Sequence, residues 1–168
     1  MGTNQRSQVA MTPDEIEAFV SSQRTANLVT LGANGHPHAV AMWFALIDGV
    51  FWFETKAKSQ KAVNLMRDPR ATVLIEDGLT YDSLRGVSLE GTVEIIDDPD
   101  ALWAVGVSVW ERYTGPYTDE MKPFVEMMLN KRVAARFTAT RTRSWDHRKL
   151  GLDPIPLGGT TAPNIEGT

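Results

Sequence analysis

The chain has 168 residues, 42% of them hydrophobic, with no cysteine and a formal net charge of −4. This length predicts a single domain with one core and about 8,200 Å² of exposed surface. The absence of cysteine excludes a disulfide scaffold, a zinc ribbon, an iron–sulfur site and a thiol nucleophile. The acidic balance argues against a nucleic-acid partner, and the sequence shows neither a membrane span nor a signal peptide, so we expect a cytoplasmic globular protein.

The N-terminal third predicts a leader, a helix and a group of strands. Residues 1–11 are expected to form a flexible leader, and Thr12-Pro-Asp-Glu15 is typical of a capped helix start. Asn34-Gly35 and Asp48-Gly49 are strong hairpin signals between apolar and β-branched runs. They predict an antiparallel meander of three strands, over residues 26–31, 36–47 and 50–55.

The rest of the chain alternates between helices and strands. Further helices are expected from Ser59, Asp98 and Thr118, because each is followed by an apolar stripe at helical spacing. Three more strands are expected over residues 71–75, 87–95 and 133–138. Gly91 lies inside one of them and indicates a bulge or a close approach of another backbone.

These elements predict the architecture and the extent of the domain. Six largely antiparallel strands with helices at their rim suggest a small, mainly β barrel. It would occupy residues 12–150. The Pro/Gly-rich residues 151–168 would then form a C-terminal arm or disordered tail.

The positive charges are concentrated in two short segments. Residues 56–70 hold five basic residues against one acidic residue, and residues 131–149 hold seven against one. In the first segment the lysines surround a predicted helix N-terminus, where backbone N–H groups and the helix dipole favour an anion. The candidate phosphate-binding residues are Lys56, Lys58, Ser59 and Lys61. A solvated lysine face explains the same pattern, and the residues alone leave both interpretations open.

Other catalytic patterns are weaker or missing. His36 and His38 share a strand face, but no spacing of His, Asp and Glu matches a metal site, so no metal is expected. No nucleophile elbow, dinucleotide fingerprint or P-loop sequence occurs. The aromatic residues of the first strands should mainly fill the core, and these are Trp43, Phe44, Phe51, Trp52 and Phe53.

The run from Phe53 to Arg70, with its Lys-x-x-Asn-Leu-x-x-Asp-Pro-Arg pattern, resembles the FMN-binding split-barrel superfamily, whose founding members are the pyridoxamine 5′-phosphate oxidases. Within it, the chain is most similar to the flavin/deazaflavin oxidoreductases, especially the branch that uses coenzyme F-420. Residues 86–94 and 144–151 also resemble that branch. The resemblance implies a homodimeric, six-stranded antiparallel split barrel. Its cofactors would lie at the subunit interface, which suits a chain too short to enclose a large cofactor alone.

The resemblance also implies a cofactor site. The phosphate would be held by Lys56, Lys58, Ser59 and Lys61. Thr55 would close the ring pocket, and the strand from His38 to Trp43 would run along the ring, with the backbone of Ala41 and Met42 at its polar edge. Trp145 would contribute from the partner chain.

The implied activity is hydride transfer between the deazaflavin F-420 and a small electrophilic organic substrate. No catalytic side chain is identified. The carboxylates of the F-420 tail would use the two basic segments, which favours F-420. An FMN-dependent oxidoreductase on the same fold and a non-catalytic cofactor- or haem-binding module are the alternatives. Neither a nucleic acid nor a membrane is expected as a partner.

Overall fold

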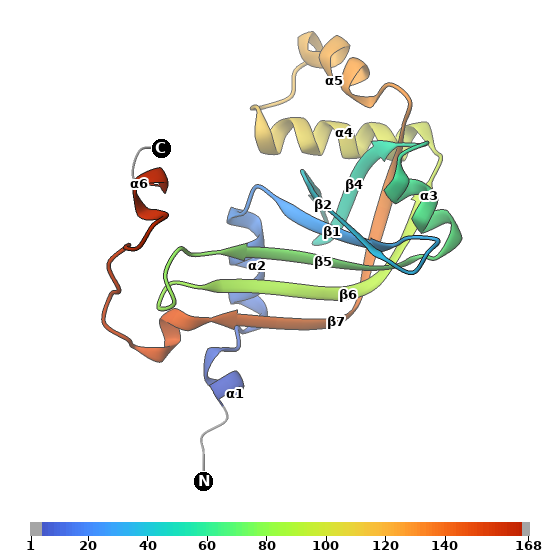
Figure 1. The fold of residues 1–168 in the computed structure, drawn as a ribbon. Coiled ribbons are helices and arrows are strands. Elements are labelled where there is room, and N and C mark those ends of the chain that lie inside the picture. The colour runs from blue at the N-terminus through green and yellow to red at the C-terminus, as the bar shows by residue number, and fades with distance from the viewer. Residues whose placement is uncertain (1–4, 166–168) are drawn as a thin grey trace.

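The structure is a computed structural model that describes residues 5–165 (Figure 1). In these residues one curled antiparallel sheet has the strand order β2-β1-β5-β6-β7-β4-β3. The strands are β1 Ala26–Leu31, β2 Pro37–Met42, β3 Ala45–Ile47, β4 Val50–Lys56, β5 Arg70–Asp77, β6 Arg85–Ile96 and β7 Arg132–Asp146. The helices are α1 Gln5–Val9, α2 Pro13–Ser22, α3 Gln60–Arg67, α4 Pro99–Tyr113, α5 Lys122–Leu129 and α6 Ala162–Ile165, with 3-10 turns at Asp119–Met121 and His147–Leu150.

The fold is mainly β, as expected, but the prediction of six strands is wrong because the described residues form seven. The stretch predicted as one strand over residues 36–47 bends at Trp43 and Phe44 and becomes β2 and β3. β2 pairs with β1 and β3 pairs with β4, so both predicted hairpins are confirmed. β2 and β3 lie at opposite ends of the strand order, however, so the single middle strand of the predicted meander is wrong. One bent stretch of chain therefore supplies both edges of the sheet, which curls into a half-barrel.

The C-terminal end of α4 holds this bend in place. The hydroxyl of Tyr113 accepts a hydrogen bond from the Phe44 N–H at 3.0 Å and donates one to the Phe44 carbonyl at 3.2 Å. The Tyr113 ring stacks on Trp43, with the ring centroids 4.3 Å apart. The neighbouring Arg112 lies over the Phe44 ring and donates to the carbonyl of Gln23, just after α2. α4 thus links the bend to α2.

We expect Tyr113→Phe to lower the free energy of unfolding by about 1–2 kcal/mol, because it leaves the backbone polar groups of the buried Phe44 without their partner. Chemical denaturation measures this loss. Tyr117→Phe, which removes a hydroxyl from a ring packed on Trp103, is the control and should change stability by less than about 0.5 kcal/mol. Equal stability of the two variants would show that the Tyr113 hydroxyl does not hold the bend.

The β6–β7 ribbon is longer than the sequence predicts. β7 extends to Asp146 because it pairs with β6 from Ala134 to Asp146. The ladder shifts register between Glu90 and Gly91. A Cβ atom on Gly91 would overlap the Thr138 carbonyl oxygen. Both predicted features of Gly91, the bulge and the close approach, are therefore confirmed.

The main core lies inside the curl of the sheet. Phe44, Phe53, Leu28 and Ile75 are among its fully buried side chains. α2 covers this core with Phe19 and Val20. The predicted cap of this helix is confirmed, since Thr12 and Glu15 form a capping box. No helix in residues 5–165 is long and apolar enough to cross a membrane.

The two ends of the chain differ in how they meet the body of the protein. Of the predicted leader, residues 1–4 lie outside the described part; α1 follows them, and the Met11 N–H donates to the Ser144 hydroxyl at 3.0 Å. Of the predicted arm, residues 166–168 lie outside the described part, and residues 151–161 extend away from the sheet before α6 (Figure 1). The accessible surface of 10458 Å² exceeds the roughly 8,200 Å² expected for a compact chain of this size.

Candidate functional site

The predicted phosphate-binding residues lie where β4 ends and α3 begins. Ser59 is the N-cap of α3, and its hydroxyl accepts a hydrogen bond from the Ala62 N–H at 3.4 Å. The buried Thr55 forms a hydrogen bond with the same hydroxyl at 3.1 Å, so it positions the cap. Lys56 and Lys58 are exposed on either side of the turn. The turn therefore presents cations and the first N–H groups of a helix to the same space.

A buried carboxylate lies beneath these lysines. Glu54 on β4 is 9% exposed, and its Oε2 is 3.0 Å from the Nε of Arg132 on β7. Burial raises the pKa of Glu54, an effect opposed by Arg132, Lys56 and Lys61. Burial also lowers the pKa of Lys61, and repulsion from Arg132 lowers it further, while Glu54 raises it. Three cations share one carboxylate, so the cluster carries an excess of positive charge that an anion would stabilise.

Arg132 joins the two basic segments in space, because Lys56 lies opposite it in the β4–β7 ladder. Lys131 is held next to the turn through its carbonyl, which accepts from the Ala57 N–H at 3.1 Å. Much of the second segment is used elsewhere, in ion pairs along and after β7: Arg136–Glu94, Arg143–Glu90, Arg148–Asp146 and Lys149–Glu15. Its contribution to this site therefore comes from its first residues.

A groove of about 480 Å³ lies between α3 and the β1–β2 hairpin and includes several polar side chains in its lining. Inside it, the fully buried Asn64 accepts from Gln60 at 2.8 Å and donates to the Thr30 hydroxyl at 3.0 Å. His38 lies opposite Thr30 in the β1–β2 ladder and also lines the groove. Its Nδ1 is buried and has no hydrogen-bond partner among the described residues. This nitrogen is available to a polar atom of a ligand.

The other predicted residues lie in β2 and the bend after it, except for Trp145. Ala41 is exposed, and Met42 packs partly against the core. Trp43 is 55% exposed, with one ring face stacked on Tyr113. Trp145 instead lies near the far end of β7, and its ring covers Gly86. Within one chain the structure places His38 in the same groove as residues of α3, whereas Trp145 lies at the far end of β7.

The site role of four residues in this region was not predicted from the sequence, and these are Arg132, Glu54, Gln60 and Asn64. Glu54 had a signal, since it is a carboxylate in an otherwise apolar strand just before the lysines. Arg132 lies in the basic segment 131–149, but its position beside the lysines depends on the pairing of β4 with β7.

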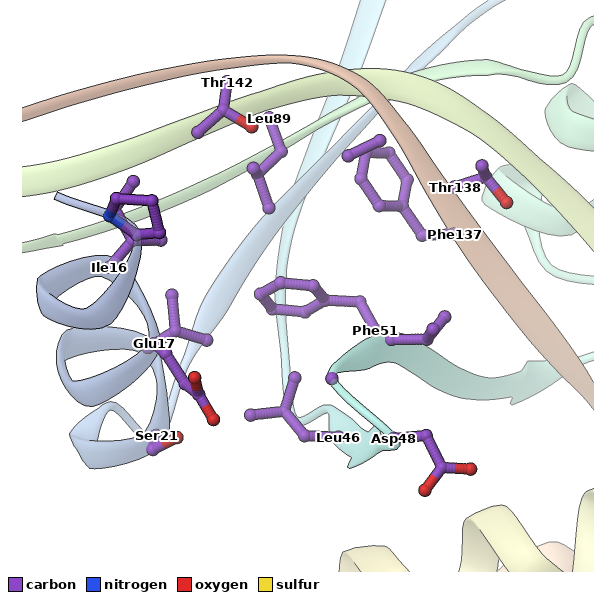
Figure 2. Close-up of a pocket in the computed structure, with 15 residues that line it drawn as sticks. Ile16, Glu17, Ser21, Leu46, Asp48, Phe51, Leu89, Phe137, Thr138 and Thr142 are labelled. Atoms are coloured by element: carbon purple, nitrogen blue, oxygen red, sulfur yellow. The ribbon is translucent and has the colours of Figure 1, made fainter.

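A larger cleft of about 850 Å³ lies elsewhere, between α2 and the β3–β4 hairpin (Figure 2). The charged side chains that line it are Glu17 and Asp48, both acidic, so its chemistry does not suit a phosphate. Among the described residues no group of three or more His, Asp or Glu side chains could hold a metal ion.

A curled antiparallel sheet with a cationic turn leading into a helix is the architecture of a split barrel. Residues 12–146 match the pyridoxamine 5′-phosphate oxidase family, and the chain belongs to this family. The resemblance that the sequence showed is thereby confirmed.

Several relatives cover most of the chain. The crystal structure of a conserved hypothetical protein from Mycobacterium tuberculosis is 64% identical with a TM-score of 0.91, over 95% of this chain and 99% of that one. An F420 reductase structure is 27% identical with a TM-score of 0.61, over 78% of this chain and 98% of that one. The F420H(2)-dependent biliverdin reductase of Mycobacterium tuberculosis is 31% identical over 120 residues, which are 70% of this chain and 84% of that protein.

Proposed function

We propose that this protein is an oxidoreductase that transfers a hydride between coenzyme F-420 and a small electrophilic organic substrate. The observation that carries the proposal is the cluster of Lys56, Lys61 and Arg132 around the single carboxylate of Glu54. Desolvation and repulsion already weaken the protonation of Lys61, and the negative charge of a phosphate placed beside it would offset both effects. The cluster fits the phosphate that F-420 and FMN share.

The chain's own residues would bind and orient the cofactor. Lys61 and Arg132 would hold the phosphate, with Lys56, Lys58 and the Ser59 cap at its edge. The His38 Nδ1 would pair with a polar atom of the bound molecule, since it is buried without a partner in residues 5–165. Ala41 and Met42 of β2 and Trp43 of the following bend would line the ring. When bound, the deazaflavin supplies the hydride chemistry, and the protein supplies alignment and exclusion of water.

The names of two relatives favour F-420 over FMN, because both are described as F420-dependent or F420 reductases. The ion pairs along β7 limit the electrostatic support for this choice, since they neutralise cations that would otherwise meet the carboxylates of the F-420 tail. Titration of both cofactors therefore also tests two alternatives, an FMN enzyme and a non-catalytic cofactor- or haem-binding module.

A second copy of the chain completes the proposal. The accessible surface exceeds that of a compact monomer, and Trp145 lies apart from the other predicted residues of its own chain. In a homodimer the Trp145 of one protomer would reach the cofactor of the other. Sedimentation velocity measures whether the protein is dimeric.

We expect Lys61→Ala to weaken F-420 binding about 10- to 100-fold, because a charge-assisted hydrogen bond to phosphate contributes about 1.5–3 kcal/mol. Fluorescence titrations of F-420 and FMN into wild type and variant measure this loss. Lys122→Ala is the matched control, since Lys122 is an exposed lysine on α5. Unchanged affinity in Lys61→Ala would refute the phosphate assignment. Tighter binding of FMN would favour the FMN enzyme, and binding without turnover of any electrophile would favour a binding module.

A further inference from the structure

The cleft between α2 and the β3–β4 hairpin has an apolar floor (Figure 2). Ile16 points into it from α2, Leu46 and Phe51 from β3 and β4, and Leu89 and Phe137 from the long ribbon of β6 and β7. The rings of Phe51 and Phe137 meet edge to face, with centroids 6.4 Å apart and an interplanar angle of 89°. A volume of about 850 Å³ and a mainly apolar lining are typical of small-molecule sites.

The charges at this cleft have one sign. Glu17 comes from α2 and Asp48 from the turn between β3 and β4, so carboxylates are supplied by both walls. Neither forms an ion pair with another described residue, and no lysine, arginine or histidine lines the cleft. Ser21, Thr138 and Thr142 add hydroxyl groups. Two unpaired carboxylates beside an apolar floor attract a positive charge attached to an apolar group.

We infer that this cleft is a second binding site, which takes a small hydrophobic cation such as an aromatic amine. The apolar part would lie on Phe51 and Phe137, and the ammonium group would lie near Glu17 and Asp48. The cleft shares no lining residue with the groove between α3 and the β1–β2 hairpin. The inference is therefore independent of the proposed cofactor site, whose ligand is anionic.

Three naphthalene compounds that differ in charge test the inference on the full chain by calorimetric titration at neutral pH. They are the protonated 1-naphthylmethylamine, the neutral 1-naphthylmethanol and the anionic 1-naphthylacetate. The amine should bind about fivefold more tightly than the alcohol, and the acetate most weakly, because two exposed carboxylates each contribute a modest attraction. In the double variant Glu17→Gln/Asp48→Asn, the amine and the alcohol should bind equally, with the affinity for the alcohol unchanged.

Two further variants locate the binding and separate it from the proposed function. Ile16→Trp should narrow the cleft above its apolar floor and weaken the binding of all three compounds, with circular dichroism confirming that the variant is folded. Lys61→Ala should leave their affinities unchanged, whatever it does to cofactor binding.

Several results would overturn the inference. These are equal affinities of wild type for the amine and the alcohol, or an affinity for the amine that is the same in Ile16→Trp as in wild type. A changed sedimentation coefficient of Ile16→Trp would assign the cleft to a second copy of the chain. Tighter amine binding in Ile155→Asp would assign it to the C-terminal arm, where Ile155 is exposed.

Discussion

Gly91→Val should destabilise the protein by about 3 kcal/mol, the largest loss of stability that we expect from a single substitution. The paired strands β6 and β7 lie so close together at this point that a Cβ atom on Gly91 would overlap the Thr138 carbonyl oxygen and press on the Phe137 ring. The obstacle is backbone on one side, so a rotamer change cannot relieve it, and β6 must separate from β7.

Denaturant titration followed by tryptophan fluorescence measures this effect. Gly158→Val is the matched control, because a Cβ atom at this position would have its nearest neighbour at 3.9 Å. We expect this variant to change stability by less than about 0.5 kcal/mol. If Gly91→Val unfolds at the same denaturant concentration as the control, the close approach of β6 and β7 at Gly91 is not a feature of the protein in solution.

Arg132→Gln should have the second largest effect, a loss of about 2 kcal/mol at neutral pH, because it leaves the buried Glu54 charge without its ion-pair partner. The value lies below that of a fully buried pair, since 30% of the Arg132 side chain is exposed. Arg136→Gln is the control on the same strand. Its partner Glu94 is itself exposed, so we expect less than about 0.5 kcal/mol.

The loss in Arg132→Gln should depend on pH in a defined direction. Burial raises the pKa of Glu54 above its ordinary value of 4.5, and removing Arg132 removes the main opposing effect. The folded variant then binds a proton more readily than the unfolded chain, so stability is lost as the pH rises through the folded-state pKa. The deficit should be largest above the raised folded-state pKa and should shrink as the pH falls through it towards 4.5.

The double variant Glu54→Gln/Arg132→Gln should recover most of the lost stability and remove the pH dependence of the deficit. It tests the ion pair itself, because the buried charge and its partner are removed together. A deficit in Arg132→Gln that is equal at acidic and neutral pH would mean that Glu54 is not the group responsible.

Local chemistry predicted the starts of α2, α3 and α4, whereas α5 begins at Lys122 after a 3-10 turn that Thr118 does not cap. The capping box of Thr12 and Glu15 and the cap of Asp98 before Pro99 depend on residues three positions apart or fewer, and both begin helices in the structure. The break at Trp43 and Phe44 could not be predicted in this way. It depends on Tyr113, which is far along the chain and reaches the bend only when α4 packs on the sheet.

The same distinction applies to the candidate site. The lysines around Ser59 are neighbours in sequence, so their pattern indicated an anion site and the structure places them at one helix start. Arg132 joins them through strand pairing, and the acidic cleft is assembled from α2, the β3–β4 hairpin and the long ribbon. Neither the Arg132–lysine cluster nor the cleft can be recognised from a short stretch of sequence, because each is assembled from separate segments of the chain.

The bent stretch that supplies both edges of the sheet also limits how the protein can aggregate. An exposed edge strand is a template on which another chain can add a strand. Here one edge, β3, has only three residues, and the other, β2, begins with Pro37, which has no N–H group to donate. Strand addition is thus disfavoured at either edge, and we expect any association with a second copy to use a face of the sheet, where side chains rather than backbone groups select the partner.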